Sequence, residues 1–149
     1  MTTAKDVAVS AYNACWDLLE RQRTDAEDVS LLASAFESRY FWSAAGGPQE
    51  HAVADWMVSR AAAATGNPRM ALSFAWASLE HDGEHFPAWL QASLLEGLAR
   101  ALVSGGADAE AQTVMDRARD ILREEPDGES SNVIEGQIRE LEQIVHAKD

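Results

Sequence analysis

The sequence predicts an all-α fold: a right-handed superhelix of three helical hairpins plus a C-terminal capping helix, in one domain over residues 1–149. Apolar residues recur at helical spacing almost throughout the chain, and no window alternates with a period of two. Turn residues also fall into two interleaved series with spacings near 40, Thr24, Gly66 and Gly106 in one and Gly47, Gly83 and Gly128 in the other. A single hairpin would leave an apolar face in water, so the three hairpins must stack.

The first hairpin is expected at about 4–46. Its first helix, at about 4–22, carries an apolar stripe of Val9, Tyr12, Trp16 and Leu19. Thr24 followed by Glu27 is a capping box, which predicts the start of the second helix. The stripe expected on that helix is Val29, Leu32, Phe36 and Tyr40.

The second hairpin is expected at about 48–82, the third at about 86–125 and the cap at 130–148. Gly66 ends one helix, and Asn67 followed by Pro68 is an N-cap with proline at the first helical position of the next. Pro87 opens the third hairpin, and the SGG sequence at 104–106 marks its turn. The cap carries Ile134, Ile138, Leu141 and Val145 on one face.

Two stretches resemble tetratricopeptide repeats. The segment AAAATGNPRMALSFAWASLEHDGEHFPAW, residues 61–89, is similar to one unit passing into the next, with Ala71 at the small-residue position. The segment ADAEAQTVMDRARDILREEPDG, residues 107–128, resembles a second helix of such a unit, with Ala111 and Met115 in the small and bulky positions. The resemblance implies a protein-interaction module whose groove is lined by the first helix of each hairpin.

Composition excludes several classes of partner. Twelve Lys and Arg against 25 Asp and Glu give a formal net charge of -13, which opposes binding to nucleic acid or to an anionic membrane. The chain has no apolar leader segment and no apolar run long enough to span a bilayer, so we expect a soluble, cytoplasmic protein. Cys15 is the single cysteine, which rules out an intrachain disulfide, and we interpret it as a buried small hydrophobe.

Three histidines raise the question of a metal site. His51, His81 and His85 are enough for a three-imidazole centre with an open position for water, as in small helical-bundle metal hydrolases, which the trio loosely resembles. A helix running through His81 and His85 would be needed, however, and residues 82–87 contain glycine and proline. We therefore predict a turn in which His81 donates to the last carbonyls of a helix, with no metal or other cofactor.

The tryptophans are candidates for either core or binding surface. Five tryptophans at helical spacing among alanines are typical of side chains that fill the gaps between hairpins. Trp56 is the expected exception, because Val53 and Met57 already supply the apolar edge beside it. Trp56 is therefore a candidate partner-binding residue.

Arg60 and Arg100 are the other candidate partner-binding residues. Each is a lone basic residue among alanines and leucines on a helix expected to line the groove, where its planar fork can meet a carboxylate. The alternative is pairing within the chain, Arg60 with Asp55 or Glu50, and Arg100 with Glu96 at i, i+4 spacing.

The sequence thus favours a non-catalytic module that binds a peptide or helix of a partner protein, since no nucleophile motif or phosphate-binding loop is present. Two other functions stay open. One is a metal-dependent hydrolase or transferase that uses His51, His81 and His85, and the other is a self-associating structural homodimer.

Overall fold

The computed structural model describes residues 1–81, 85–124 and 128–148. Within these residues the chain forms seven α-helices and no strand, which confirms the all-α prediction. In chain order they are α1 (Ala4–Leu19), α2 (Asp25–Ala45), α3 (Pro48–Ala64), α4 (Pro68–Leu79), α5 (Ala88–Ser104), α6 (Asp108–Leu122) and α7 (Glu129–His146).

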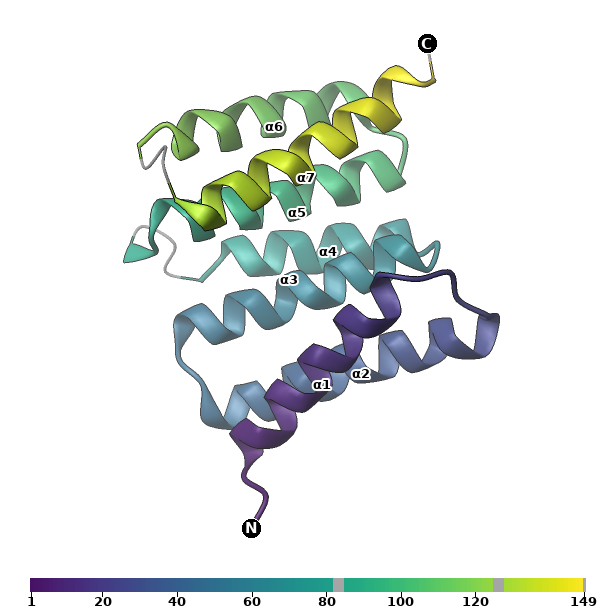
Figure 1. Cartoon of the computed structure of the whole chain (residues 1–149), viewed down its shortest axis with the longest axis vertical. Helices are drawn as coiled ribbons and strands as arrows, with labels where there is room; N and C mark the ends of the chain where they lie inside the picture. Colours follow the sequence, from purple (N-terminus) through teal and green to yellow (C-terminus); the bar gives the residue numbers. More distant parts are fainter. Residues whose placement is uncertain (82–84, 125–127, 149) are drawn as a thin grey trace.

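The helices pack as sequential pairs, α1 on α2, α3 on α4 and α5 on α6, and the pairs stack in chain order from the N-terminus to the C-terminus (Figure 1). The first helices of the pairs also contact one another, α1 with α3 and α3 with α5. The last helix, α7, continues this series by packing on α5. We call α1, α3, α5 and α7 the inner helices, and α2, α4 and α6 the outer helices.

Two of the turns within pairs are built alike. Gly66 and Gly106 have positive φ angles of 78° and 83°, which glycine adopts without the steric cost that a side chain would impose. After each glycine the next backbone N–H bonds back over the end of the helix, Asn67 to the carbonyl of Ala62 at 2.8 Å and Ala107 to that of Leu102 at 2.9 Å. Both turns are Schellman motifs, which supply hydrogen-bond donors to carbonyls left unpaired at the C-terminal ends of α3 and α5.

The helix starts follow from local sequence. The predicted capping box of Thr24 and Glu27 is present at α2, and Thr3 and Asp6 form a second one at α1. Pro68 is the first residue of α4, as expected. Asn67 occupies the N-cap position but its side chain does not cap α4; its amide donates to Thr65 instead.

Buried positions recur 40 residues apart along the chain. On the outer helices the equivalent buried residues are Leu31, Ala71 and Ala111; Ala35, Ala75 and Met115; and Ser38, Ser78 and Ala118. On the inner helices Ala52, Val58 and Ala61 of α3 correspond to Ala92, Leu98 and Ala101 of α5. The same surfaces of successive pairs therefore face the core.

The apolar stripe predicted for α2 is wrong. Val29 and Tyr40 are exposed, and α2 instead buries Leu31, Ala35 and Ser38. The hydroxyl of Ser38 donates to the carbonyl of Ala8 at 2.9 Å, a contact between backbone and side chain that requires α1 and α2 to lie close together. Small side chains permit that close approach. The buried face of α2 therefore cannot be recognised from the positions of its large apolar residues.

The stripe predicted for α1 is displaced for the same reason. Its buried residues are Ala8, Ala11 and Cys15, whereas Val9 is exposed. Tyr12 and Trp16 are only partly buried and turn toward the other inner helices.

The predicted ends of the second and third hairpins, at 82 and 125, lie outside the described residues; α4 ends at Leu79 and α6 at Leu122. Among the helices that are described, none combines the length and the apolar character that crossing a bilayer requires. The capping helix predicted at 130–148 is α7, and it buries Ile134, Ile138 and Leu141.

Candidate functional site

A cleft rich in aromatic side chains opens between the inner helices, with Trp42 contributed by the outer helix α2. Its volume is about 600 Å³, within the range of ligand-binding pockets. We call it the aromatic cleft. Its aromatic lining is Tyr12, Trp16, Trp42, Trp56 and Trp89, its aliphatic lining is Val53, Leu90, Leu94, Val133 and Ile134, and its polar lining is Gln49, Glu50, Ser93, Glu129, Ser130 and Gln137.

The rings of the cleft form a connected wall. The Trp16 and Trp56 ring centroids lie 5.9 Å apart, and Tyr12 meets Trp16 edge to face at 6.4 Å. Trp56 lies directly against the backbone of α5 at Gly97, where an added Cβ would stand only 2.5 Å from its Cδ1 atom. A glycine at 97 is therefore what allows Trp56 to occupy this position.

Trp56 was expected to be the one tryptophan outside the core, and this is corrected: it is buried. Only 5% of Trp56 is exposed, because α5 and Trp16 cover it. The most exposed tryptophan is Trp76 on the outer helix α4, at 53%, followed by Trp89 at the cleft, at 38%. Trp56 contributes to the cleft as part of its floor.

A second hollow of about 320 Å³ lies further along the inner helices. We call it the arginine hollow. Its lining is Leu19, Arg23, Arg60, Ala63, Ala64, Arg100, Val103, Ser104, Leu141 and Ile144. Both predicted arginines therefore face one hollow, together with Arg23, which was not predicted.

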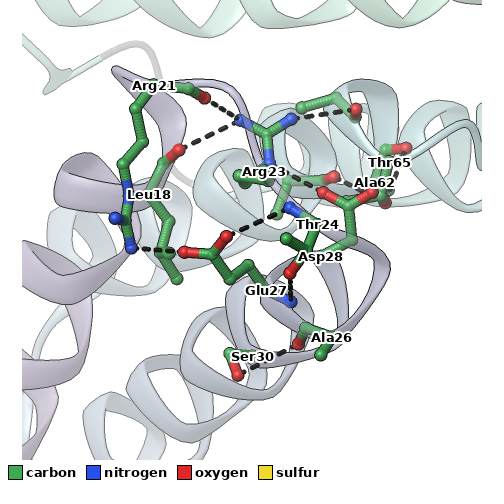
Figure 2. Close-up of polar contacts among 12 residues, drawn as sticks. Leu18, Arg21, Arg23, Thr24, Ala26, Glu27, Asp28, Ser30, Ala62 and Thr65 are labelled. Carbon is green, nitrogen blue, oxygen red and sulfur yellow. Dashed lines mark hydrogen bonds and ion pairs between the residues drawn. The ribbon is translucent and has the colours of Figure 1, made fainter.

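Arg23 is fully engaged within the chain. Figure 2 shows its guanidinium reaching the carbonyl oxygens of Leu18 and Arg21, at 3.0 and 3.1 Å, and the carboxylate of Asp28, at 2.7 Å. It also donates to the carbonyl of Ala64 at the end of α3, at 3.2 Å. A cation at the C-terminal ends of α1 and α3 is favourable for the helix dipoles, so Arg23 ties the two ends together.

Arg100 and Arg60 share one fully buried carboxylate, that of Glu96. Arg100 donates twice to Oε1 of Glu96, at 3.0 and 2.6 Å, which confirms the i, i+4 pairing. Oε2 of Glu96 lies 3.9 Å from Nη1 of Arg60, an ion pair too long for a hydrogen bond. The pairing expected between Arg60 and Asp55 or Glu50 is therefore wrong, because Glu96 on the neighbouring helix is the acid that Arg60 meets.

Arg60 forms the partition between the two hollows. Its guanidinium lies 4.9 Å from the Trp16 ring and 5.6 Å from the Trp56 ring, both cation–π contacts. Burial, assisted by the nearby charge of Arg100, lowers the pKa of Arg60 to about 10, so the group stays protonated at neutral pH. Among the described residues, the buried side-chain atoms left without a hydrogen bond are Trp56 Nε1, Arg60 Nη1 and Glu96 Oε2, and all three belong to this partition.

Asp55, which was expected to serve Arg60, is bound elsewhere. Its buried carboxylate accepts from Nε of Arg39 at 2.6 Å and lies 2.9 Å from Nε2 of His81. His81 was predicted to donate to carbonyls at a helix end, and this is corrected: its partner is Asp55. The contact ties His81, two residues beyond the end of α4, to the middle of α3.

The structure brings His51 and His81 together but does not assemble a metal site from the three histidines. The rings of His51 and His81 lie 6.1 Å apart, and Nε2 of His51 faces the carbonyl of Trp42 at 3.0 Å. Within residues 1–81, 85–124 and 128–148, no three His, Cys, Asp or Glu side chains are grouped closely enough to hold a metal ion. The glycine that was expected to break the helix, Gly83, lies outside these residues.

Cys15 is buried, as predicted, with its Sγ 3.9 Å from the carbonyl of Leu31. Burial raises the pKa of its thiol to about 12, so the thiol stays protonated at neutral pH. A thiolate nucleophile is not available at this position.

The binding role of Trp56, Arg60 and Arg100 stays a prediction; Trp56 lines the cleft, the two arginines line the hollow, and the other aromatic residues of the cleft were not predicted to bind. The cleft residues that were not predicted to bind are Tyr12, Trp16, Trp42 and Trp89, and the contact of Glu96 with Arg60 was not foreseen. One signal was present in the sequence: Arg60 and Arg100 are 40 residues apart, the same spacing as the turn glycines Gly66 and Gly106. Equivalent positions on neighbouring helices face the same surface, so the spacing pointed to a shared hollow.

Comparison of the chain with protein-family models, with curated proteins and with solved structures found no match.

Proposed function

We propose that this chain is a tetratricopeptide-like helical repeat protein that binds a segment of a partner protein, a peptide or a helix, on its inner helices. The observation that carries the proposal is the aromatic cleft, where four of the chain's five tryptophans, all of them among the described residues, line one opening. Tryptophan is enriched at the residues that dominate protein interfaces, because it offers a large rigid apolar surface with a polar edge.

The recurrence of buried positions at 40 residues supports the repeat part of the proposal. In stacked hairpins the first helices line one continuous face, and this is where such architectures hold extended partners. The aromatic cleft and the arginine hollow both lie on that face. Trp89 and Val133 at the cleft remain well exposed, so a partner that covers them removes apolar surface from water.

Trp56, Arg60 and Arg100 keep their proposed role as partner-binding residues. Trp56 forms the floor of the cleft, and the two arginines, with 15% and 19% of their side chains exposed, present an edge to the adjacent hollow. We propose no reaction, because the residues gathered on this face are aromatic rings and ion-paired side chains rather than a nucleophile with a base.

A random peptide library displayed on phage tests the proposal without knowledge of the partner. We expect peptides to be enriched on the wild-type chain, and calorimetry should show that Trp89→Ala weakens them by about 2 kcal/mol, roughly thirtyfold. Trp76→Ala is the matched control, since Trp76 is also exposed but lies on the outer helix α4. Failure to enrich any peptide, or equal binding by wild type and Trp89→Ala, would contradict the proposal.

Self-association is the second candidate function, supported by the apolar side chains that the outer helices expose, Val29 and Tyr40 on α2 and Trp76 on α4. Light scattering over a concentration series measures it directly. A dimer that dissociates on Tyr40→Ser and persists in Trp89→Ala would place the contact on the outer helices.

A further inference from the structure

The charge of the aromatic cleft has one sign. Among the described residues that line it, the acidic side chains are Glu50 and Glu129, and no Lys, Arg or His is present. Both glutamates are exposed and both lie in the first turn of an inner helix, α3 and α7. The cleft thus combines aromatic walls with a carboxylate rim, in a chain whose net charge is -13.

Aromatic faces and carboxylates both attract cations. The negative face of an indole ring stabilises a nearby ammonium or guanidinium group, and the chain already uses this contact where Arg60 lies over Trp16 and Trp56. Trp42 and Trp89 line the cleft without such a contact to Arg60. The aliphatic side chains beside them, Val53 and Val133 among others, provide room for an apolar group next to the cation.

The nearby arginines do not cancel the attraction of the cleft for cations. Arg23 is occupied by backbone carbonyls and Asp28, and Arg100 by the buried carboxylate of Glu96. Arg60 lies behind the Trp16 and Trp56 rings, between them and Glu96. An acidic segment would also have to approach against the overall negative charge of the chain, whereas a basic one is attracted by it.

We infer that the aromatic cleft takes a basic amphipathic segment of a partner protein. An apolar side chain of the segment lies among the tryptophans, and a neighbouring lysine or arginine lies against Glu50 and Glu129. This inference rests on the proposed function and adds the chemical class of the partner.

Three synthetic peptides of equal length test the chemistry: an amphipathic helix of leucine and lysine, its charge-reversed form of leucine and glutamate, and a serine–lysine peptide that keeps the charge without the apolar face. Each is titrated into the full chain carrying Trp76→Phe, so that the tryptophan fluorescence comes from the four rings that line the cleft. We expect the leucine–lysine peptide to bind at least about tenfold more tightly than either of the others. Equal or tighter binding of the leucine–glutamate peptide would overturn the inference.

Matched variants separate the cleft from general attraction to an acidic protein. Glu129→Gln and Glu110→Gln each remove one negative charge from the first turn of a helix, but Glu110 lies on α6, outside the cleft. For the leucine–lysine peptide we expect about a fivefold loss of affinity with Glu129→Gln and less than about a twofold loss with Glu110→Gln. Equal losses would show non-specific charge attraction and overturn the inference.

The library selection described above distinguishes failure of this inference from failure of the proposed function. Enriched peptides that are acidic and depend on Arg60 would overturn the basic partner and leave the proposed function standing. An absence of any enriched peptide would contradict both. A second copy of the chain that fills the cleft, detected by light scattering and abolished by Trp89→Ala, would also overturn the inference.

Discussion

The aromatic cleft and the arginine hollow lie on the same inner helices, on either side of Arg60, yet they are built in opposite ways. In the hollow the charged groups bind other groups of the same chain: Arg100 binds Glu96, and Arg23 binds the ends of two helices. In the cleft, Trp89 and Glu129 are exposed, whereas Glu50 is exposed but also accepts a hydrogen bond from the backbone N–H of Gly47 at the start of α3. The difference teaches that the charges of the hollow are largely neutralised within the chain, whereas Glu129 at the rim of the cleft is exposed to a partner.

Loss of the buried carboxylate should separate the two regions most strongly. Glu96→Gln keeps the shape of the side chain but leaves Arg60 and Arg100 without their anion, and we expect a loss of roughly 3 to 5 kcal/mol in the free energy of unfolding. Glu129→Gln at the cleft, an exposed side chain, should cost less than about 1 kcal/mol. Urea denaturation of both variants measures the difference, and similar losses would remove the distinction between the two regions.

A smaller effect is expected where the cleft meets α5. Gly97→Ala places a Cβ within 2.5 Å of Trp56, so we expect a loss of about 1 to 3 kcal/mol in spite of the better helix propensity of alanine. Gly136→Ala on α7 is the control, because nothing lies within 4 Å of its added Cβ. It should stabilise the protein by about 0.5 to 1 kcal/mol. Thermal unfolding tests the pair, and stabilisation by both changes would show that Trp56 does not press on Gly97.

A partly buried ion pair between α6 and α7 is expected to give the smallest change in stability. Hydrogen bonds from Arg119 on α6 lower the pKa of Glu142 on α7 to about 2, from an ordinary value of 4.5. Because the folded pKa is the lower one, this stabilisation is complete above the unfolded pKa and is lost as the pH falls toward 2. We expect Glu142→Gln to be less stable than wild type by about 1 kcal/mol at neutral pH and equally stable near pH 2. A difference that does not change with pH would argue against the ion pair.

Local signals in the sequence predicted the helices well, because caps and turns depend on a few neighbouring residues. Thr24 with Glu27, Pro68, Gly66 and Gly106 all lie where the sequence indicates a start or an end. Together with the turn spacing near 40 residues, these signals predicted which helices pair into hairpins.

The faces of the helices were harder to predict, because close packing here depends on small residues. Ser38 and Ala35 are buried on α2 while Val29 and Tyr40 are exposed, and nothing in the local pattern of large apolar residues shows this. The same limit applied to the candidate site. Arg60 on α3 meets Glu96 on α5, and His81 after α4 meets Asp55 on α3. Each contact joins residues of different helices or turns, so tertiary packing decides which acid each of the two basic side chains meets.

The indole N–H signals of the tryptophans test the central claim, that partners bind at the aromatic cleft, most directly. The chain has five tryptophans, four at the cleft and Trp76 on the outer helix α4, and Trp76→Phe identifies the signal of the fifth. On titration with a peptide selected from the library, we predict that the signals of Trp16, Trp42, Trp56 and Trp89 shift together while that of Trp76 stays in place. A shift of the Trp76 signal with the other four unchanged would contradict the account.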